Sequence, residues 1–443
     1  MRLRGCSVPV MRWTGLDGPR RLPRAAELAD LLRPRPVVLN GDRRRAARAA
    51  SVEDLRAMAR RRVPRAVFDY VEGGAESERS LARAREALDS VHFIARVLRG
   101  VSTVDTRATI LGAPSALPIV FAPTGFTRVL HHEGELATAR AAGAAGVPFA
   151  LSTMGTCSVE DVAEIIPGCR RWFQLYLWSD RGRSRELVDR AAAAGYEALV
   201  LTVDTPVAGR RLRDVRNGMT LPPSLGPRTF IDGARHPHWW IDLLTTRALN
   251  FASLNSWQGT VAELAATLFD PAVDFEDLAW LREQWPGKLV VKGVQSAEDA
   301  VRIASAGVDA IVLSNHGGRQ LDRSATPLRQ LPEVLDRLEG RCEVFVDGAF
   351  TSGADVVAAL ALGADAVLVG RAYLYGLMAA GELGVRRVAA LFEEEITTTM
   401  TLLGARSIAE LTPDLVRLGP APETRGHRRW ADLAEASLSI QPG

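Results

Sequence analysis

Lysine is almost absent from this 443-residue chain: of its 55 basic residues only Lys288 and Lys292 are lysines. Arginine therefore provides nearly all the positive charge, and the net charge is only +3. So small an excess gives no reason to expect a nucleic acid partner. Because arginine is the basic residue almost everywhere else, we expect Lys292, which stands in an apolar run, to have a specific function.

Cysteines are also few and lie far apart. The chain has four, with no C-x-x-C pair and no C-x-x-C-H haem-attachment motif. This indicates free thiols in a reducing compartment and disfavours a disulfide framework or a zinc site. No apolar run reaches the roughly 18–20 residues that span a bilayer, and the N-terminus has no apolar signal segment. We expect a cytoplasmic protein and leave open a peripheral contact with the inner face of the membrane.

Eight short apolar segments recur along the chain, and stretches rich in Ala, Leu and Glu separate most of them. The segments are 119–123, 148–152, 172–177, 198–204, 288–293, 310–314, 344–348 and 366–370. Short buried strands that alternate with helices predict an α/β fold, a (β/α)₈ TIM barrel. We divide the chain into an Arg/Pro-rich arm (1–50), the barrel with an N-terminal helical extension (51–411) and a tail (412–443).

Two helices are predicted ahead of the barrel. Ser51, with Asp54 three residues later, forms a capping box, and Pro64 opens a helix over 65–72 that ends at Gly73-Gly74. In the arm we expect one short helical piece around 24–32.

The regular spacing is interrupted by a long insertion after the fourth strand, at about 217–280. A connection of this length is usually functional or mobile. It contains Trp239 and Trp240, followed by the apolar stretch 241–244. We interpret it first as a lid or a subunit contact, and a membrane interface stays open.

The chemistry of such a barrel lies at the C-terminal ends of its strands. The sixth strand is followed by His316, which titrates near neutrality and can act as a base, and by Arg319, whose planar fork suits a carboxylate. Lys292 ends the fifth strand. It could form a Schiff base, contact a phosphate or stabilise an anion, and the last role fits its neighbours best.

Glycines follow the seventh and eighth strands, at Gly348 and Gly370, and Arg371 comes next. Backbone N–H groups at these two strand ends commonly hold a phosphate. The sequence therefore predicts a phosphorylated cofactor or substrate.

The run from Ser314 to Asp322, Ser-Asn-His-Gly-Gly-Arg-Gln-Leu-Asp, resembles the active-site signature of the FMN-dependent L-2-hydroxy acid oxidising family. That family includes glycolate oxidase, lactate oxidase, flavocytochrome lactate dehydrogenase and mandelate dehydrogenase. The resemblance extends over about 51–411, with supporting matches at 68–70, 122–125, 173–176, 202–206 and 290–294. The arm and the stretch 209–218 are most similar to actinobacterial respiratory L-lactate dehydrogenases.

The resemblance implies roles for particular residues. His316 takes a proton from the substrate, Asp204 stabilises the resulting imidazolium, and Tyr176 hydrogen-bonds the substrate hydroxyl or the developing carbonyl. The substrate carboxylate is held by Tyr70, Arg211 and Arg319. The residues expected to bind FMN are Pro123, Thr124, Gly125, Ser152, Gln174, Thr202, Lys292, Ser314, Asp347, Gly348, Gly370 and Arg371, with Lys292 beside the N1–C2=O edge of the ring.

The chain departs from the family pattern in three places. After Asp347-Gly348, where many relatives carry arginines for the phosphate, the run is Ala-Phe-Thr-Ser-Gly. Met154 stands where glycolate-type members have a substrate-facing Trp, and Trp178 stands at the second aromatic of Tyr-x-Tyr relatives. We therefore expect the phosphate to depend on Arg371 and on backbone and hydroxyl donors.

The function implied is oxidation of an L-2-hydroxy acid, first of all L-lactate to pyruvate, by a homotetramer that passes electrons to a quinone or a protein carrier. One alternative is an oxidase that passes electrons to O₂ and forms hydrogen peroxide. Others are a flavin barrel acting on an aryl-glycolate or a peptide-derived substrate, and a flavin-binding scaffold or sensor without turnover. Tyr70, Tyr176, Asp204, His316 and Arg319 disfavour the scaffold, because FMN binding alone does not require them.

The remaining histidine pairs, His131-His132 and His236/His238, show no H-E-x-x-H pattern or matched carboxylate spacing. The sequence therefore gives no reason to expect a metal site.

Overall fold

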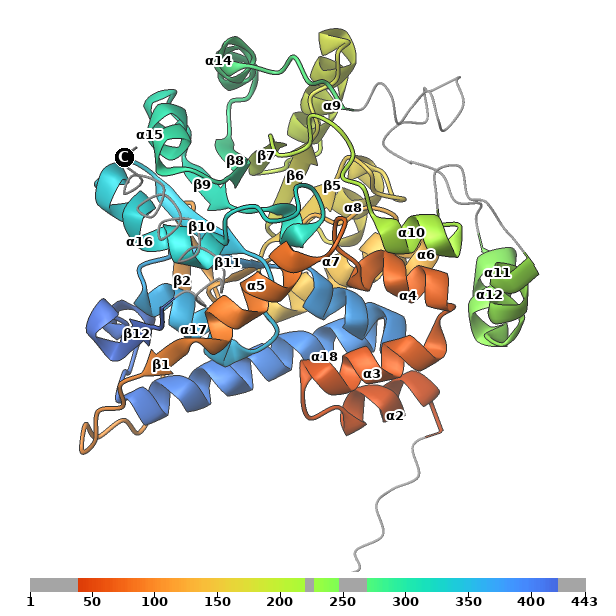
Figure 1. The fold of residues 1–443 in the computed structure, drawn as a ribbon, viewed down its shortest axis with the longest axis horizontal. Coiled ribbons are helices and arrows are strands. Elements are labelled where there is room, and N and C mark those ends of the chain that lie inside the picture. The colour runs from red at the N-terminus through yellow and green to blue at the C-terminus, as the bar shows by residue number, and fades with distance from the viewer. Residues whose placement is uncertain (1–38, 220–226, 247–268, 421–443) are drawn as a thin grey trace, which may run out of the picture. The chain divides into compact units, whose positions relative to one another are not determined.

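The computed structural model describes residues 39–219, 227–246 and 269–420. Eight parallel strands close into a barrel in the order β10-β11-β4-β5-β6-β7-β8-β9, as predicted (Figure 1). They are β4 (Ile119–Phe121), β5 (Phe149–Ser152), β6 (Arg171–Leu175), β7 (Ala198–Thr202), β8 (Lys288–Val294), β9 (Ala310–Leu313), β10 (Glu343–Asp347) and β11 (Ala366–Val369). Each coincides with one of the eight predicted apolar segments.

A helix follows each barrel strand and covers the outside of the barrel. These helices are α7 (Gly134–Ala145), α8 (Val159–Ile165), α9 (Arg181–Ala193), α14 (Phe275–Gln284), α15 (Ala297–Ser305), α16 (Pro327–Leu338), α17 (Gly353–Ala361) and α18 (Arg371–Leu403). The last is interrupted by non-helical backbone at Ala380 and Gly381. Their apolar faces and the outer faces of the strands form one continuous core.

The inside of the barrel is filled by side chains and is closed at the N-terminal end. Trp172 and Phe345 stack across the interior with ring centroids 6.0 Å apart. The hairpin of β2 (Ala108–Ile110) and β3 (Ala113–Ser115) covers the bottom, where Ile110 is fully buried and the Leu111 N–H donates to Glu343 at the start of β10 (2.9 Å). A ligand can therefore enter only from the C-terminal end.

From residue 39 on, four helices precede the barrel: α2 (Gly41–Arg48), α3 (Val52–Arg62), α4 (Arg65–Glu72) and α5 (Arg79–Asp89). The capping box of Ser51 and Asp54 at α3 and the bounds of α4 are as predicted. The folded body nevertheless extends beyond both predicted boundaries. α2 lies within the predicted arm and buries Ala46. β12 (Val416–Leu418), within the predicted tail, pairs antiparallel with β1 (Val91–Phe93). The helical piece predicted at 24–32 lies outside the described residues.

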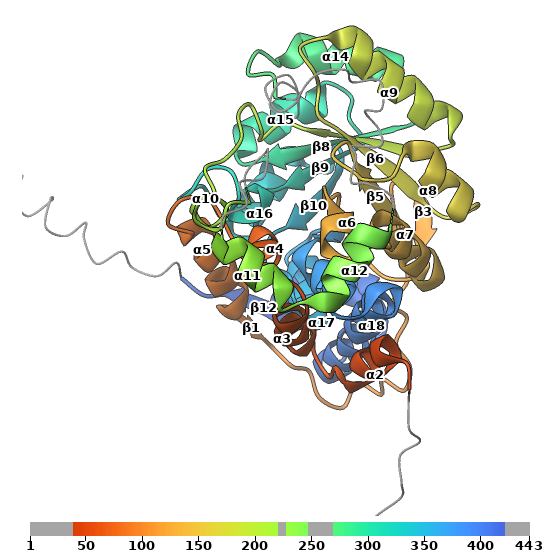
Figure 2. The same cartoon turned by 90° about the vertical axis from the view of Figure 1, so that its right-hand side faces the viewer.

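The insertion after β7 contributes α10 (Leu212–Asn217), α11 (Pro227–Ala234) and α12 (Pro237–Thr245). In Figure 2, α12 lies beside α6 (Thr127–Leu130). Trp239 Nε1 donates to the carbonyl of Val129 in α6 (2.7 Å), so α12 is held on the barrel. No helix in the described ranges is both long and apolar enough to cross a membrane.

Candidate active site

A cavity of about 750 Å³ opens at the C-terminal end of the barrel. The predicted site residues that line it are Tyr70, Pro123, Thr124, Gly125, Ser152, Tyr176, Arg211, Lys292, His316, Arg319, Asp347, Gly348, Gly370 and Arg371. The other four, Gln174, Thr202, Asp204 and Ser314, have buried side chains just behind this lining. Folding thus gathers all the predicted residues around one cavity.

His316 and Asp204 form a partly buried pair at the edge of this cavity. His316 Nδ1 lies 3.0 Å from Asp204 Oδ1, and the Asp204 side chain is only 1% exposed. Burial alone would raise the pKa of Asp204, but His316 and Lys292 hold that pKa below its usual value. With Nδ1–H donating to this carboxylate, the other ring nitrogen of His316 has a free lone pair.

The turn that carries His316 is tightly packed. His316, Gly317 and Gly318 all have positive φ, at +57°, +60° and +72°. A Cβ on Gly317 would lie 2.6 Å from Arg371 Nη1, and one on Gly318 would lie 2.8 Å from the Leu81 nitrogen. Glycine is therefore needed at both positions, because it adopts the left-handed backbone conformation without strain and lets α5 and α18 approach the turn closely.

Two arginines give the cavity positive charge opposite this pair. Arg319 Nη1 donates to the carbonyls of Tyr70 (2.6 Å) and Gly73 (3.1 Å), and its guanidinium lies 5.1 Å from the centre of the Tyr70 ring. Burial, with a further contribution from Arg211, lowers the pKa of Arg319 to about 10. Arg211 pairs with Asp214 at 2.9 Å. Two partly buried guanidinium groups that line one cavity favour an anionic ligand.

Lys292 adds a further positive charge to the site, and its side chain is buried. Its Nζ donates to Ser314 Oγ (2.9 Å) and lies 3.0 Å from Asp347 Oδ2. Burial disfavours the ammonium, but Asp347 and Asp204 outweigh it and raise the pKa of Lys292. The side chain therefore stays charged at neutral pH.

Several buried polar atoms at the strand ends make no hydrogen bond within the described residues: Gln174 Nε2, Thr202 Oγ1 and Asp347 Oδ1. Gln174 is oriented by Ser152, whose hydroxyl donates to its Oε1 at 2.9 Å. Buried polar groups are almost always paired, so unpaired ones beside a cavity indicate a polar ligand.

The end of the cavity nearest α17 differs from expectation. Arg371 lines it, but its guanidinium donates to the carbonyls of Val71 (2.9 Å), Gly317 (2.8 Å) and Gly73 (2.9 Å). Arg85 also lines it, donating to Ala349 O at 3.0 Å and forming two bonds to Asp355. No sequence pattern connected Arg85 with this site, since its partners lie more than 260 positions away.

Phe269 was also missed. It lines the cavity where the chain returns from the insertion, and its ring centroid lies 5.5 Å from that of Tyr176. Phe269 stands at the end of a long insertion without a recognisable pattern, so nothing in its local sequence indicates a place in the cavity.

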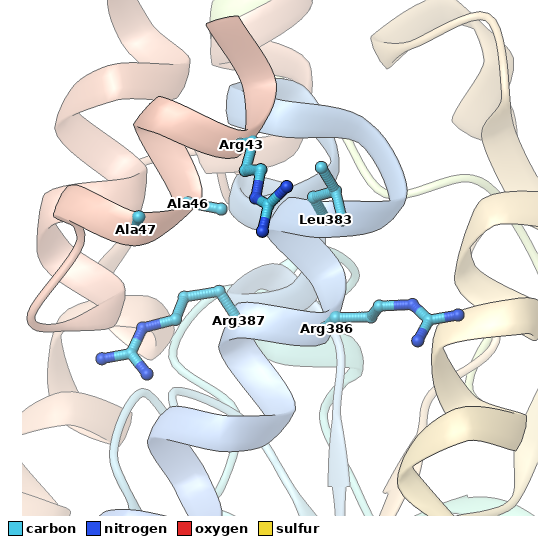
Figure 3. A pocket seen from close by; sticks show the side chains of 6 residues that line it. All are labelled: Arg43, Ala46, Ala47, Leu383, Arg386 and Arg387. Atoms are coloured by element: carbon cyan, nitrogen blue, oxygen red, sulfur yellow. The ribbon is translucent and has the colours of Figure 1, made fainter. Parts of the chain in front are cut away.

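A second, shallower cavity of about 440 Å³ lies between α2 and α18 (Figure 3). Arg43, Arg386 and Arg387 surround it, but the last two side chains point away from each other. Each is also engaged by an acidic residue, Glu382 or Glu394. This arrangement does not converge on a ligand.

Comparison with known proteins agrees with this geometry. The family described as FMN-dependent dehydrogenase matches residues 59–418. A Mycobacterium tuberculosis protein named provisionally as an L-lactate dehydrogenase is 54% identical over 405 residues, covering 90% of this chain and 98% of that protein. The L-lactate dehydrogenase of Caulobacter vibrioides is 43% identical over 377 residues, covering 83% and 97%.

Among solved structures, the monotopic membrane protein (S)-mandelate dehydrogenase matches with a TM-score of 0.80 and 39% identity, covering 84% of this chain and 100% of that chain. The family match spans most of the helical extension and the whole barrel, which confirms the resemblance seen in the sequence. The chain belongs to the FMN-dependent dehydrogenase family, whose cofactor is FMN.

Proposed function

We propose that this protein oxidises L-2-hydroxy acids, with L-lactate to pyruvate as its main reaction, and passes the electrons to a quinone or a protein carrier. The observation that carries the proposal is the His316–Asp204 pair at 3.0 Å in a cavity that also presents Arg211 and Arg319. A base and a carboxylate-binding pair are what such a substrate needs. The relatives named L-lactate dehydrogenase support lactate as the first choice.

The residues of the cavity fit FMN. The unpaired Gln174 Nε2 and Thr202 Oγ1 suit the polar edge of a flavin ring, and the Lys292 ammonium suits an electron-rich part of it. Gly348 and Gly370, after β10 and β11, leave backbone N–H groups for the phosphate. When bound, FMN supplies the acceptor for the two electrons that leave the substrate.

Each remaining role belongs to a side chain of the cavity. His316 accepts a proton from the substrate, and Asp204 orients the imidazole and stabilises its charged form. The Tyr176 hydroxyl hydrogen-bonds the substrate hydroxyl. Arg319 and Arg211 bind the substrate carboxylate. Since Nη1 of Arg319 bonds to backbone carbonyls, we assign its Nε and Nη2 to the substrate.

The deciding experiment compares electron acceptors and substrates. L-lactate, glycolate and (S)-mandelate are each offered with dichlorophenolindophenol under nitrogen and, separately, with O₂ and a peroxide assay. The proposal expects L-lactate to give the highest kcat/KM with the dye and little peroxide. Rapid peroxide formation would favour an oxidase. A preference for mandelate would overturn the substrate assignment.

We further propose a homotetramer with a peripheral membrane contact through α12. Ile241 and Leu244 of this helix are 57% and 75% exposed, which suits an interfacial helix. The structural neighbour described as a monotopic membrane protein supports this choice. Analytical ultracentrifugation of the FMN-loaded protein tests the tetramer.

A further inference from the structure

Two histidines outside the active-site cavity meet a carboxylate from the insertion. His131 and His132 directly follow α6, and Asp242 lies in α12. One ligand atom from each of the three residues lies within 4.8 Å of the others. The two imidazole rings stack with centroids 4.5 Å apart. The sequence around His131 and His132 offers no carboxylate at a metal-binding spacing, but folding brings Asp242 beside them.

One ring nitrogen of this cluster makes no hydrogen bond within the described residues. His132 Nδ1 is buried and makes no hydrogen bond, although Asp242 Oδ2 lies 3.3 Å away. His131 is only 6% exposed. A buried polar atom left unpaired calls for an explanation, and a bound ion is one of the common ones.

His131 has one ring nitrogen engaged and one available. Its Nδ1 accepts a hydrogen bond from the Glu133 N–H (3.4 Å) and lies 3.6 Å from Glu133 Oε2. Metal-bound histidines usually donate their second ring N–H to a carboxylate or a backbone carbonyl, so a metal at Nε2 requires Nδ1–H to point at Glu133 Oε2 in place of accepting from the backbone. A Cβ on Gly381 would lie 3.1 Å from Nε2, so the glycine keeps space open beside it.

Two arginines interact with the carboxylates around the cluster. Arg62 acts electrostatically on Asp242, and Arg140 bonds to Glu133 at 3.1 Å. These arginines offset the two carboxylates, which leaves the imidazole nitrogens as the main source of affinity.

We propose that His131, His132 and Asp242 bind a divalent transition-metal ion of the zinc type, and that this ion fastens α12 to the barrel beside α6. Two imidazoles and a carboxylate are ligands that Zn²⁺ accepts with an open fourth position. Mg²⁺ and Ca²⁺ prefer oxygen ligands throughout. The bond from Trp239 to Val129 already holds the helix close enough for Asp242 to reach the histidines.

The test is calorimetric titration of ZnCl₂ into the FMN-loaded full chain. We expect one Zn²⁺ per chain in the parent and at least about tenfold weaker binding in His132→Ala and in Asp242→Asn. The matched control is His92→Ala, which removes an exposed histidine from β1 and should bind Zn²⁺ like the parent. MgCl₂ should give no saturable heat.

A second measurement distinguishes an ion that fastens α12 to the barrel from one that only binds the histidines. Zn²⁺ should slow amide hydrogen exchange over 237–245 in the parent but not in Asp242→Asn. The proposal is overturned if the parent shows no saturable Zn²⁺ binding, or if both variants bind as the parent does. Unchanged exchange in the Zn²⁺-bound parent would also overturn the fastening role.

Discussion

Lys292, Asp204 and Arg319 are charged residues whose partners belong to the protein. Lys292 contacts Asp347, Asp204 contacts His316, and Arg319 bonds to backbone carbonyls. Their positions are therefore set before a ligand binds, which is what makes such groups effective in stabilising charge that develops during a reaction.

Replacement of His316 by Asn should leave FMN binding intact and slow substrate oxidation by on the order of 10²–10⁴-fold, because the base is gone. Asp204→Asn should slow it less. The double variant should be scarcely slower than His316→Asn alone, since the two residues act as one unit. Anaerobic stopped-flow loss of FMN absorbance on mixing with L-lactate measures all three. A parent-like rate in His316→Asn would contradict the assignment.

The pKa of Lys292 is raised in the folded state, since its carboxylate neighbours outweigh burial. A raised pKa means that the ammonium stabilises the fold below its unfolded pKa, and that this contribution is lost as pH rises through the folded pKa. We expect Tm to fall more steeply with rising pH for the parent than for Lys292→Met above about pH 10. Thermal unfolding followed by circular dichroism measures this, and equal slopes would show that Lys292 contributes nothing.

An irregularity within β8 determines the position of Asp204, which lies in the loop after β7. The pairing register of β8 with β9 shifts between Lys292 and Val294, and Gly293 between them has φ +107°. A Cβ on Gly293 would lie 2.7 Å from Asp204 Cβ and 2.8 Å from the Asp204 nitrogen. The bulge thus allows the close approach that sets Asp204 beneath His316.

Gly293→Ala should therefore displace Asp204 and lower kcat/KM for L-lactate by about 10²-fold, since misplacement near 1 Å costs that much. The matched control is Gly168→Ala: Gly168 also has positive φ, +77°, but has no atom within 4 Å of the added Cβ. The control should show a small loss of Tm and unchanged kinetics. If both variants behave alike, the close approach at Gly293 does not matter.

The return from the insertion shapes the substrate side of the cavity through Phe269. Phe269→Ala removes the ring that packs edge-on against Tyr176, so the cavity should admit bulkier substrates. We expect kcat/KM for L-lactate relative to (S)-mandelate to fall about tenfold or more. Phe275→Ala, at the start of α14 and over Arg302, removes an equal ring outside the cavity and should leave the ratio unchanged.

The elements that close the barrel and the residues that line the cavity lie at opposite ends of the barrel. The β2–β3 hairpin closes the N-terminal end, while the cavity, the His316 turn and the start of the insertion lie at the C-terminal end. Changes in the insertion can therefore alter substrate access and partner contacts with little effect on the core.

The proposed membrane contact predicts that Ile241→Ser combined with Leu244→Ser weakens binding to anionic phospholipid vesicles by at least about tenfold, because each lost side chain removes roughly 1.5–3 kcal/mol of apolar burial. Co-sedimentation of the FMN-loaded protein with vesicles measures this. Leu402→Ser, which changes an equally exposed leucine (68%) near the end of α18, is the control. If the parent stays in the supernatant, α12 is not a membrane contact.

The barrel and most of its site could be predicted from the sequence because their signals are local. Short apolar runs with β-branched residues specify buried strands, and their alternation with helices specifies the closed sheet. In this fold all strand ends of one polarity meet at one opening, so reading the ends together located Lys292, His316 and Arg371.

Other contacts were decided by tertiary structure alone. Arg85 reaches Ala349, Asp242 reaches His132, and Phe269 meets Tyr176 through packing between segments far apart in the chain. The same packing directs the Arg371 guanidinium to three backbone carbonyls. Local patterns report which face of an element is buried, but which side chain fills a gap depends on the shapes of all its neighbours, which exist only once the chain is folded.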